Sequence, residues 1–343
     1  AHRSLLAQLH CDHQVRALRD HRPHDLYASD PGFRRFIRID PEQTVPVYCY
    51  VRKNAKTKHK ENKDTGATFK QQTEQLSLDK LFSAKSLGHG QFGRVYLVTN
   101  ETRSCEYALK CIEKCMILES RLEKHLQNEK LVLEQINHPF LIQYGRSFKD
   151  ANYIYFLTEH INGMEMFDVI RDIGLLKSRD TCLYIAQMLQ ALDYLHRNNI
   201  IYRDLKPENI MVDKEGYLKL IDMGTCKIMS TKATLPKTFT IIGTPHYMGP
   251  EVLSGKGYTY HADLWSLGVC MYEFMEGYVP FGEDAEDPYE IYSEIIKKDI
   301  EFPNYINDDK AKALMRQLLS KIPETRLGGS FAALYNNPWF SSI

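Results

Sequence analysis

Near its middle the chain reads Ile201-Tyr202-Arg203-Asp204-Leu205-Lys206-Pro207-Glu208-Asn209. Apolar residues flank this stretch on both sides, at Ile200-Ile201 and Ile210-Met211-Val212. Short apolar runs of this kind are typical of strands. The polar centre is therefore predicted to be a loop that two strands fix at its ends.

The polar residues of this loop suit one kind of chemistry. Asp204 can accept or orient a hydroxyl proton, Lys206 can neutralise a transferring phosphate, and Asn209 can bind a metal ion. The alternative is an ordinary surface loop of mixed charge. A second acid favours chemistry, since Leu220-Ile221-Asp222-Met223-Gly224 places a carboxylate at the end of another apolar run. Together the two stretches predict phosphoryl transfer.

A glycine motif of the form G-x-G-x-x-G spans residues 88–93. Alternating apolar residues follow it over 95–99, then a turn at 100–102 and a second predicted strand over Tyr107–Ile112. The motif is therefore predicted to cap a hairpin, whereas in a Rossmann oxidoreductase, the alternative, it opens a helix. Glycines in such a loop let backbone N–H groups approach phosphates without obstruction by side chains.

Lys110 lies in the second strand of this hairpin, where alternation points it away from Tyr107 and Leu109. A lysine in an apolar strand is costly unless it is paired. The helix predicted over Arg121–Gln135 offers Glu129 at the margin of its apolar stripe. We therefore predict a Lys110–Glu129 ion pair that fixes the lysine for phosphate oxygens. Two unrelated surface charges are the alternative.

The bulk composition is that of a globular protein. The 343 residues are 43% hydrophobic and 26% charged, and the formal net charge is +0, which gives no indication of nucleic acid or of an anionic membrane as partner. No window reaches the roughly 18 uncharged apolar residues of a membrane helix. Eight scattered cysteines without a C-x-x-C pair favour reduced thiols and a cytoplasmic protein. Cys11 with His10 and His13 is a weak metal candidate, because no second ligand group stands at zinc-site spacing.

Residues 1–77 differ from the rest and are predicted to be a basic N-terminal extension or linker of unknown role. They are rich in histidine and contain the basic run Arg52–Lys60. Such a run is able to bind acidic lipid or a partner, although a solvated linker is favoured. Short strands are predicted at Phe36–Ile39 and Val45–Val51.

Over residues 78–340 the motifs stand in the order found in the eukaryotic protein kinases, which the chain resembles. Tyr202 before Arg203-Asp204, the run Asn128-Glu129-Lys130 and the run Gly243–Met248 are similar to the AGC group and, within it, to the cyclic-nucleotide-dependent kinases. His246 and the strand Phe156–Glu159 resemble the cGMP-dependent kinases of protists.

This resemblance implies a fold, an activity and cofactors. The fold is α+β and bilobal, with a small β-rich N-lobe over about 78–158 and a larger helical C-lobe over about 162–340. The activity is transfer of the ATP γ-phosphate, with Mg²⁺, to Ser or Thr of protein substrates that carry Arg or Lys upstream. Another AGC kinase, such as a cAMP-dependent type, is the alternative.

The resemblance also implies roles for single residues. Asp204 would be the catalytic base, Lys206 the γ-phosphate partner, and Asn209 and Asp222 the Mg²⁺ ligands. Lys110 with Glu129 would bind the α- and β-phosphates. The residues implied in nucleotide binding are Leu87, Gly88, Gly90, Phe92, Gly93, Val95, Ala108, Lys110, Thr158, Glu159, Ile161, Glu165, Glu208, Asn209 and Asp222.

A second group would regulate the loop and select substrates. Thr240 aligns with an activation-loop phosphosite. Thr244 would brace Asp204 and Lys206, and Glu251 would pair with Arg326. The side chains implied to bind a phosphate on Thr240 are Arg203, Lys227 and His125, and the acids implied to select arginine are Glu208 and Glu273.

The sequence also departs from the family pattern. Met223 replaces the phenylalanine of the DFG motif, Gly249 replaces the alanine of APE, and Tyr144 stands where an aliphatic residue is usual. The group's C-terminal tail does not appear before Ile343, and no cyclic-nucleotide-binding domain is visible, so a regulatory domain is expected outside this chain. These departures leave a pseudokinase, a nucleotide-responsive binding module, as the alternative to an active kinase.

Overall fold

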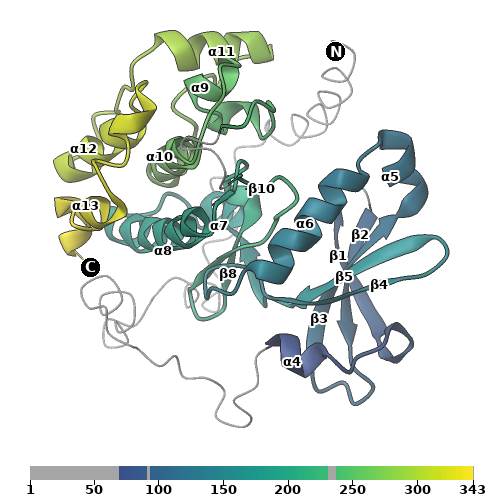
Figure 1. Ribbon diagram of the computed structural model, residues 1–343. Coiled ribbons are helices and arrows are strands. Elements are labelled where there is room, and N and C mark those ends of the chain that lie inside the picture. The colour runs from purple at the N-terminus through teal and green to yellow at the C-terminus, as the bar shows by residue number, and fades with distance from the viewer. Residues whose placement is uncertain (1–68, 91–92, 231–236, 343) are drawn as a thin grey trace. The chain divides into compact units, whose positions relative to one another are not determined.

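The computed structural model describes residues 69–90, 93–230 and 237–342 (Figure 1). All described residues belong to one compact unit. The strands predicted over 36–39 and 45–51 and the cluster around Cys11 lie outside the described residues.

The small lobe is a five-stranded antiparallel sheet with strand order β1-β2-β3-β5-β4. Two helices, α5 and α6, connect β3 to β4, and Figure 1 shows α6 running beside the sheet. The elements are β1 Phe82–Gly90, β2 Gly93–Thr99, β3 Glu106–Glu113, α5 Lys114–Ser120, α6 Glu123–Gln135, β4 Tyr144–Lys149 and β5 Tyr153–Glu159.

Alternation along the strands gives this sheet two different faces. On one face Tyr107 and Leu109 are buried with Val98 and Leu157 in an apolar cluster. Lys110 and Ala108 of β3 lie on the other face. Lys110 pairs there with Val95 of β2, and Ala108 pairs with Thr158 of β5. The predicted glycine hairpin is present, since β1 and β2 pair as far as Gly90 and Gly93.

The helix predicted over Arg121–Gln135 begins two residues later, at Glu123. Arg121 has a left-handed backbone with φ of 56° and ends α5 instead. A left-handed residue interrupts an α-helix, so the two helices are separate although the polar sequence between them contains no Gly or Pro.

A short helix that precedes the sheet packs onto it. This helix, α4 Phe69–Thr73, is the described start of the predicted N-terminal extension. The rings of Phe69 and Tyr107 lie 6.0 Å apart, and Thr73 is fully buried. Arg146 of β4 donates to the Leu76 carbonyl oxygen at 2.6 Å. The described residues before position 78 therefore contribute to the small lobe.

The large lobe is mostly helical. Its core helices are α8 Ser178–Arg197 and α10 His261–Glu276, and α10 is buried along most of its length. The other helices of this lobe are α7 Met166–Ile173, α9 Pro250–Leu253, α11 Pro288–Lys297, α12 Asp309–Leu318 and α13 Phe331–Tyr335, with the 3-10 turns η5 Pro207–Asn209, η6 Pro245–Tyr247, η7 Pro323–Thr325 and η8 Pro338–Ser342; a further 3-10 turn, η4 Leu78–Lys80, precedes β1 in the small lobe.

Short strands of the large lobe border the loop over residues 202–209. The predicted strands on both sides of this loop are present as β7 Ile200–Ile201 and β8 Ile210–Asp213. β8 pairs with β6 Gly163–Glu165 and β9 Leu218–Leu220, and β7 pairs with β10 Lys227–Ile228. The predicted fold class, a β-rich small lobe and a helical large lobe, is confirmed.

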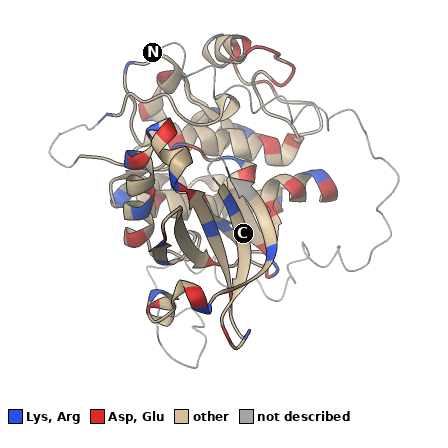
Figure 2. Ribbon diagram, turned by 90° about the vertical axis from the view of Figure 1, so that its right-hand side faces the viewer, with Lys and Arg blue, Asp and Glu red and all other residues tan. Residues whose placement is uncertain are grey.

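Charge is mixed over the described chain. In the view of Figure 2, basic and acidic ribbon segments are interspersed, in keeping with the formal net charge of +0. Within the described ranges, no helix has the length and apolar content needed to cross a bilayer.

A lysine of the large lobe lies beside two stacked aromatic rings. Lys321 Nζ is 4.4 Å from the ring centre of Phe281 and 5.0 Å from that of Trp265, and it donates to the Ile295 carbonyl oxygen at 2.5 Å. Burial, with a smaller contribution from the positive charge of Arg326, lowers the pKa of Lys321 to about 8. An ammonium is poorly solvated there, so its charged form is disfavoured in the folded chain.

This lowered pKa predicts a pH-dependent stability difference. Between about pH 8 and the ordinary lysine pKa of 10.5 the unfolded chain binds more protons at Lys321 than the folded chain, so stability rises with pH in that window. Lys321→Met removes this contribution, and its stability relative to wild type should therefore fall from pH 7 to pH 9.5, by less than about 1.4 kcal/mol per pH unit. Denaturant unfolding of both proteins at the two pH values measures this. Parallel behaviour, as expected for the exposed control Lys297→Met, would contradict it.

Candidate active site

A buried aspartate of α10 binds the backbone of the loop over residues 202–209. The Asp263 carboxylate accepts hydrogen bonds from the backbone N–H groups of Tyr202 at 2.9 Å and Arg203 at 2.8 Å, and His196 lies 2.7 Å from it. Arg203 has φ of 73°, a strained value for a residue with a Cβ. Asp263 therefore stabilises a backbone turn that would otherwise be unfavourable. Sequence reasoning assigned it no role, although an acid inside an apolar helix is a signal.

Asp204, Lys206, Asn209 and Thr244 form one hydrogen-bonded group. The Asn209 amide donates to the Asp204 carboxylate at 3.0 Å and to the Asp204 carbonyl oxygen at 2.7 Å. Lys206 Nζ donates to the Thr244 hydroxyl at 2.7 Å and lies 3.3 Å from Asp204 Oδ2. The Thr244 hydroxyl donates to Asp204 Oδ1 at 2.9 Å. The predicted bracing of Asp204 and Lys206 by Thr244 is thus present.

Asp222 adjoins this group through the β8–β9 hairpin. The Ile221 N–H donates to the Asn209 carbonyl oxygen at 3.1 Å, and the Gly224 N–H donates to Asp222 Oδ1 at 2.8 Å. The hairpin therefore brings together the two acids that are 18 residues apart in sequence, Asp204 and Asp222.

The small lobe contributes an ion pair on the other side of Asp222. Lys110 Nζ lies 2.6 Å from Glu129 Oε1, so the predicted pair is confirmed. A Cβ built on Gly224 would lie 3.1 Å from Asp222 Oδ1 and 3.6 Å from Glu129 Oε2, so these carboxylates border the same glycine. Burial favours a lower pKa for Lys110, but the Glu129 and Asp222 carboxylates outweigh it and raise the pKa. Lys110 therefore stays cationic between two acids.

Residues implied in nucleotide binding lie on the same side of the small sheet. Thr158 and Ala108 are adjacent across β3 and β5, with the Thr158 hydroxyl 3.4 Å from the Ala108 carbonyl oxygen, and Val95 pairs with Lys110. A Cβ at Gly93 would lie 1.7 Å from the Cys111 carbonyl oxygen, so only glycine fits there.

Other members of the predicted nucleotide set are less constrained. Leu87 in β1 is partly exposed, and a Cβ at Gly88 would meet nothing within 4 Å. Ile161 lies in the connection between β5 and β6. Phe92 lies outside the described residues. The nucleotide roles of all these residues remain predictions.

The two acids that the resemblance implies to select arginine, Glu208 and Glu273, both act on Tyr247, and Glu208 also acts on Glu165 of the predicted nucleotide set. Burial, followed by the charges of Asp168 and Glu208, raises the pKa of Glu165. Burial and the charges of Glu273 and Glu208 raise the pKa of the Tyr247 phenol, whose hydroxyl donates to Glu273 at 2.6 Å. Carboxylates so close together repel each other, and a cationic side chain between them would relieve that repulsion.

The predicted phosphate site around Thr240 is only partly assembled. Thr240 is exposed, as are Lys227 and His125. Within the described ranges the Thr240 hydroxyl makes no hydrogen bond to these residues, and Arg203 donates instead to the Thr225 carbonyl oxygen at 2.6 Å. The backbone of Thr240 is bound by Tyr258, whose hydroxyl donates to the Thr240 carbonyl oxygen at 2.7 Å.

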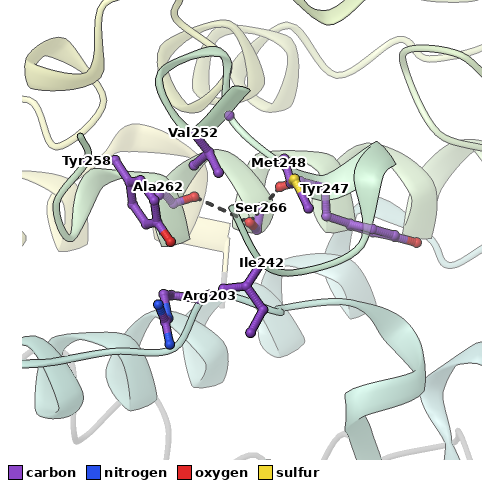
Figure 3. Close-up of a pocket in the computed structure, with 9 residues that line it drawn as sticks. Arg203, Ile242, Tyr247, Met248, Val252, Tyr258, Ala262 and Ser266 are labelled. Atoms are coloured by element: carbon purple, nitrogen blue, oxygen red, sulfur yellow. Dashed lines mark hydrogen bonds between the residues drawn. The ribbon is translucent and has the colours of Figure 1, made fainter. Parts of the chain in front are cut away.

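A small pocket lies near this segment, and Figure 3 shows Arg203 and Tyr258 on the same side of it, with Tyr247 and Met248 across from them. The Ser266 hydroxyl bonds the Tyr247 carbonyl oxygen at 2.7 Å at its edge. Among the described residues that line the pocket, Arg203 is the one with a charged side chain. Arg203 is thus the member of the predicted phosphate-binding set that lines this pocket, and the role of that set stays a prediction.

Two departures from the family pattern have a structural reason. Met223 is buried, with its sulfur 3.6 Å from Cys226 Sγ, so it fills apolar space beside Asp222 as a phenylalanine would. A Cβ at Gly249 would lie 2.7 Å from the Glu251 carboxylate, which pairs with Arg326 at 2.6 Å as predicted. Glycine at position 249 leaves room for that buried ion pair.

The residues predicted to bind Mg²⁺ have suitable chemistry. Asn209 and Asp222 supply an amide oxygen and a carboxylate, which are hard oxygen ligands. The described residues contain no cluster of three or more His, Cys, Asp or Glu able to enclose a metal ion. Mg²⁺ commonly takes one or two protein oxygens and completes its shell with water and substrate phosphates, so this pair fits it.

Comparison with known proteins agrees with this arrangement. The protein kinase domain family matches residues 82–340. A cGMP-dependent protein kinase of Toxoplasma gondii is 44% identical over 262 residues, 76% of this chain and 26% of that protein. One of Plasmodium berghei is 41% identical over 278 residues, 80% and 32% of the two chains. The cAMP-dependent protein kinase catalytic subunit of Dictyostelium discoideum is 37% identical over 260 residues, 75% and 39%.

The chain thus spans about a quarter to two fifths of the length of these relatives. The match covers both lobes and every hydrogen-bonded residue of the group around Asp204, Asp222 and Lys110. The chain belongs to the protein kinase family, whose members use ATP and a divalent metal ion.

Proposed function

We propose that this chain is the catalytic part of a serine/threonine protein kinase of the AGC type. It transfers the γ-phosphoryl group of ATP to a Ser or Thr hydroxyl in proteins with basic residues upstream of the target. The observation that carries this proposal is the contact group of Asp204, Lys206, Asn209 and Thr244, with Asp222 and the Lys110–Glu129 pair beside it.

Each residue of this group has a role in the proposed reaction. The oxygen of the substrate hydroxyl bonds to the γ-phosphorus while the bond from that phosphorus to the β–γ bridging oxygen breaks. Asp204 accepts the proton that the hydroxyl loses. Lys206 neutralises the negative charge of the phosphoryl group in transfer. Thr244 holds the side chains of Lys206 and Asp204 in place through its hydrogen bonds to both. Bound to Asn209 and Asp222, a divalent metal ion would offset charge on the phosphate oxygens. A module that only binds nucleotide has no need of the Asp204 group.

The acids Glu165, Glu208 and Glu273 support the proposed substrate preference. Glu208 and Glu273 place negative charge beside the Tyr247 phenol, and the charges of Asp168 and Glu208 add to the larger effect of burial in raising the pKa of Glu165, so placing carboxylates together here has a cost. An arginine from a substrate forms bidentate hydrogen bonds to carboxylates, which compensates that cost. We therefore expect arginine to be preferred over neutral residues upstream of the target.

Control by cGMP is part of the proposal for the full-length protein. Relatives from two apicomplexan species are named cGMP-dependent protein kinases. We propose that a regulatory domain outside this chain binds the nucleotide. The cytoplasm is the proposed location, because the described cysteines are all free thiols.

A peptide-array assay tests the function. Purified chain with ATP and Mg²⁺ should phosphorylate Ser and Thr peptides that carry upstream arginine, and should do so less well when the arginine is replaced by glutamine. No phosphate transfer to any peptide, with ATP bound, would favour the pseudokinase. Activation of the full-length protein by cGMP and not by cAMP tests the regulatory part.

The exposed Thr240 carries a prediction about regulation. Thr240→Ala should lower kcat by about tenfold or more with a smaller effect on ATP affinity, because a phosphate there would add charge-assisted hydrogen bonds to Arg203 and its neighbours. Steady-state kinetics before and after phosphatase treatment measure this. Phosphatase should slow the wild type and leave the variant unchanged. Equal kinetics of the two untreated proteins would show that the segment needs no phosphate.

A further inference from the structure

The two lobes are joined by residues 159–162, which we call the hinge. Glu159 is the last residue of β5, and β6 begins after the hinge at Gly163. The proposed function places the adenine of ATP against the backbone of the hinge. The conformation of this short connection therefore bears directly on nucleotide binding.

The side chain of Glu159 does not point to a nucleotide phosphate but is bound within the protein. Its Oε1 accepts a hydrogen bond from the Gln143 backbone N–H at 2.8 Å and another from Lys219 Nζ at 2.7 Å. The Glu159 N–H donates in return to the Gln143 carbonyl oxygen at 3.0 Å. We call Gln143, Glu159 and Lys219 the hinge clamp.

The hinge clamp joins three segments that are far apart in sequence. Gln143 ends the loop that follows α6, the helix of Glu129. Lys219 lies in the middle of β9, three residues before Asp222. The loop and β9 are also joined through backbone, since Leu220 exchanges hydrogen bonds with Phe140 and Ile142 at 3.0 and 2.9 Å. The hinge itself is tied to β9 through the Lys219 side chain.

Burial makes this ion pair different from a surface pair. The side chains of Lys219 and Glu159 are 14% and 18% exposed. Exposed pairs contribute little, because water and salt screen them. Removal of the lysine from a mostly buried pair leaves a carboxylate with less solvation than it needs, so Glu159 is driven toward water. The hinge backbone moves with it, because Glu159 is itself a hinge residue.

We propose that Lys219 is a positioning residue for the adenine end of the nucleotide site. It acts through the Glu159 carboxylate, which holds the hinge backbone in register with the loop ending at Gln143 and with the strand leading to Asp222. This inference rests on the proposed function, since it assumes that the hinge receives adenine.

Lys219→Met tests this role, with calorimetric binding of adenosine and of ATP as the main measurement. Both affinities should fall by the same factor, about tenfold, since the defect lies at the base and not at the phosphates. The KM for ATP should rise by that factor while kcat stays within about twofold. Lys219→Arg, which retains a cation and donors, should recover most of the adenosine affinity.

A matched control and a second variant separate positioning from general bracing of the fold. Lys214→Met removes an exposed lysine from the adjacent turn, where it lies 3.8 Å from Glu215, and should leave both affinities unchanged. Glu159→Gln should reduce adenosine affinity less in the Lys219→Met background than in wild type, because the two residues act as one unit. If Lys219→Met is too unstable to purify, Lys219→Gln serves the same measurements.

Three results would overturn or redirect the inference. Unchanged adenosine affinity in Lys219→Met, whatever its melting temperature, would overturn it. A rise in kcat without a change in adenosine affinity would also overturn it, because the clamp would then restrain the enzyme. Failure of the wild type to bind adenosine and ATP would refute the proposed function instead.

Discussion

Asp222→Ala should abolish metal-dependent phosphate transfer while the fold stays intact. We expect kcat to fall by about 10³-fold or more, since a lost metal contact removes several kcal/mol of charge stabilisation and each 1.36 kcal/mol is tenfold in rate. The physical reason is the position of Asp222, whose carboxylate borders Gly224 together with Glu129 and influences Lys110. A peptide-phosphorylation assay over a range of Mg²⁺ concentrations measures the effect.

The control for this variant is Asp309→Ala. Asp309 is an exposed acid in the first turn of α12 and contacts none of the groups described for the site. Its removal should leave kcat unchanged and cost at most about 1 kcal/mol of stability through the helix dipole. Full activity of Asp222→Ala, at the same melting temperature as wild type, would remove Asp222 from the proposed metal site. A fall in melting temperature alone would assign it a structural role.

Asp204→Asn should lower kcat by about 10²- to 10⁴-fold with little change in the KM for ATP or peptide. Asparagine keeps the size of the side chain but cannot accept the substrate proton. It also weakens the attraction for Lys206, whose Nζ lies 3.3 Å from the carboxylate. Single-turnover kinetics with saturating ATP and peptide separate this chemical defect from binding.

A companion variant distinguishes proton transfer from loop geometry. Thr244→Val removes the hydroxyl that bonds Asp204 at 2.9 Å and Lys206 at 2.7 Å but leaves both charges in place. Its kcat should fall less than that of Asp204→Asn, by about tenfold, the usual effect of one lost hydrogen bond in a site. Equal losses in the two variants would mean that Asp204 acts by holding the loop and not as a base.

Much of the catalytic group was predictable because its members are close in sequence. Asp204, Lys206 and Asn209 lie on one loop between two apolar strands, so local structure alone places them together. Alternation along β3 likewise separates Lys110 from Tyr107 and Leu109. Such periodic patterns predicted single strands and helices, since a period of two or 3.6 residues records which face is buried, whereas the bilobal fold class was implied by the resemblance to the protein kinases.

Apart from the Lys110–Glu129 pair, the distant contacts within the chain were predictable only where the family resemblance supplied the partner. The Glu251–Arg326 pair joins residues 75 positions apart, and composition or periodicity gives no measure of that separation. The phosphate site at Thr240 shows the limit of this approach. Its implied partners are named by the pattern, yet Arg203 is occupied by the Thr225 carbonyl oxygen in this conformation.

By itself the sequence determined the order of the elements and the residues that carry charge and chemistry, because hydrophobic period and local loop composition are properties of neighbouring residues. Only the tertiary structure decided which buried polar groups satisfy one another. Asp263 beneath the turn at Arg203 and Lys219 at the hinge show this, since each is a charged residue in an otherwise ordinary helix or strand. Their partners come from other segments, and a buried charge is tolerated only once the folded chain brings such partners within hydrogen-bond distance.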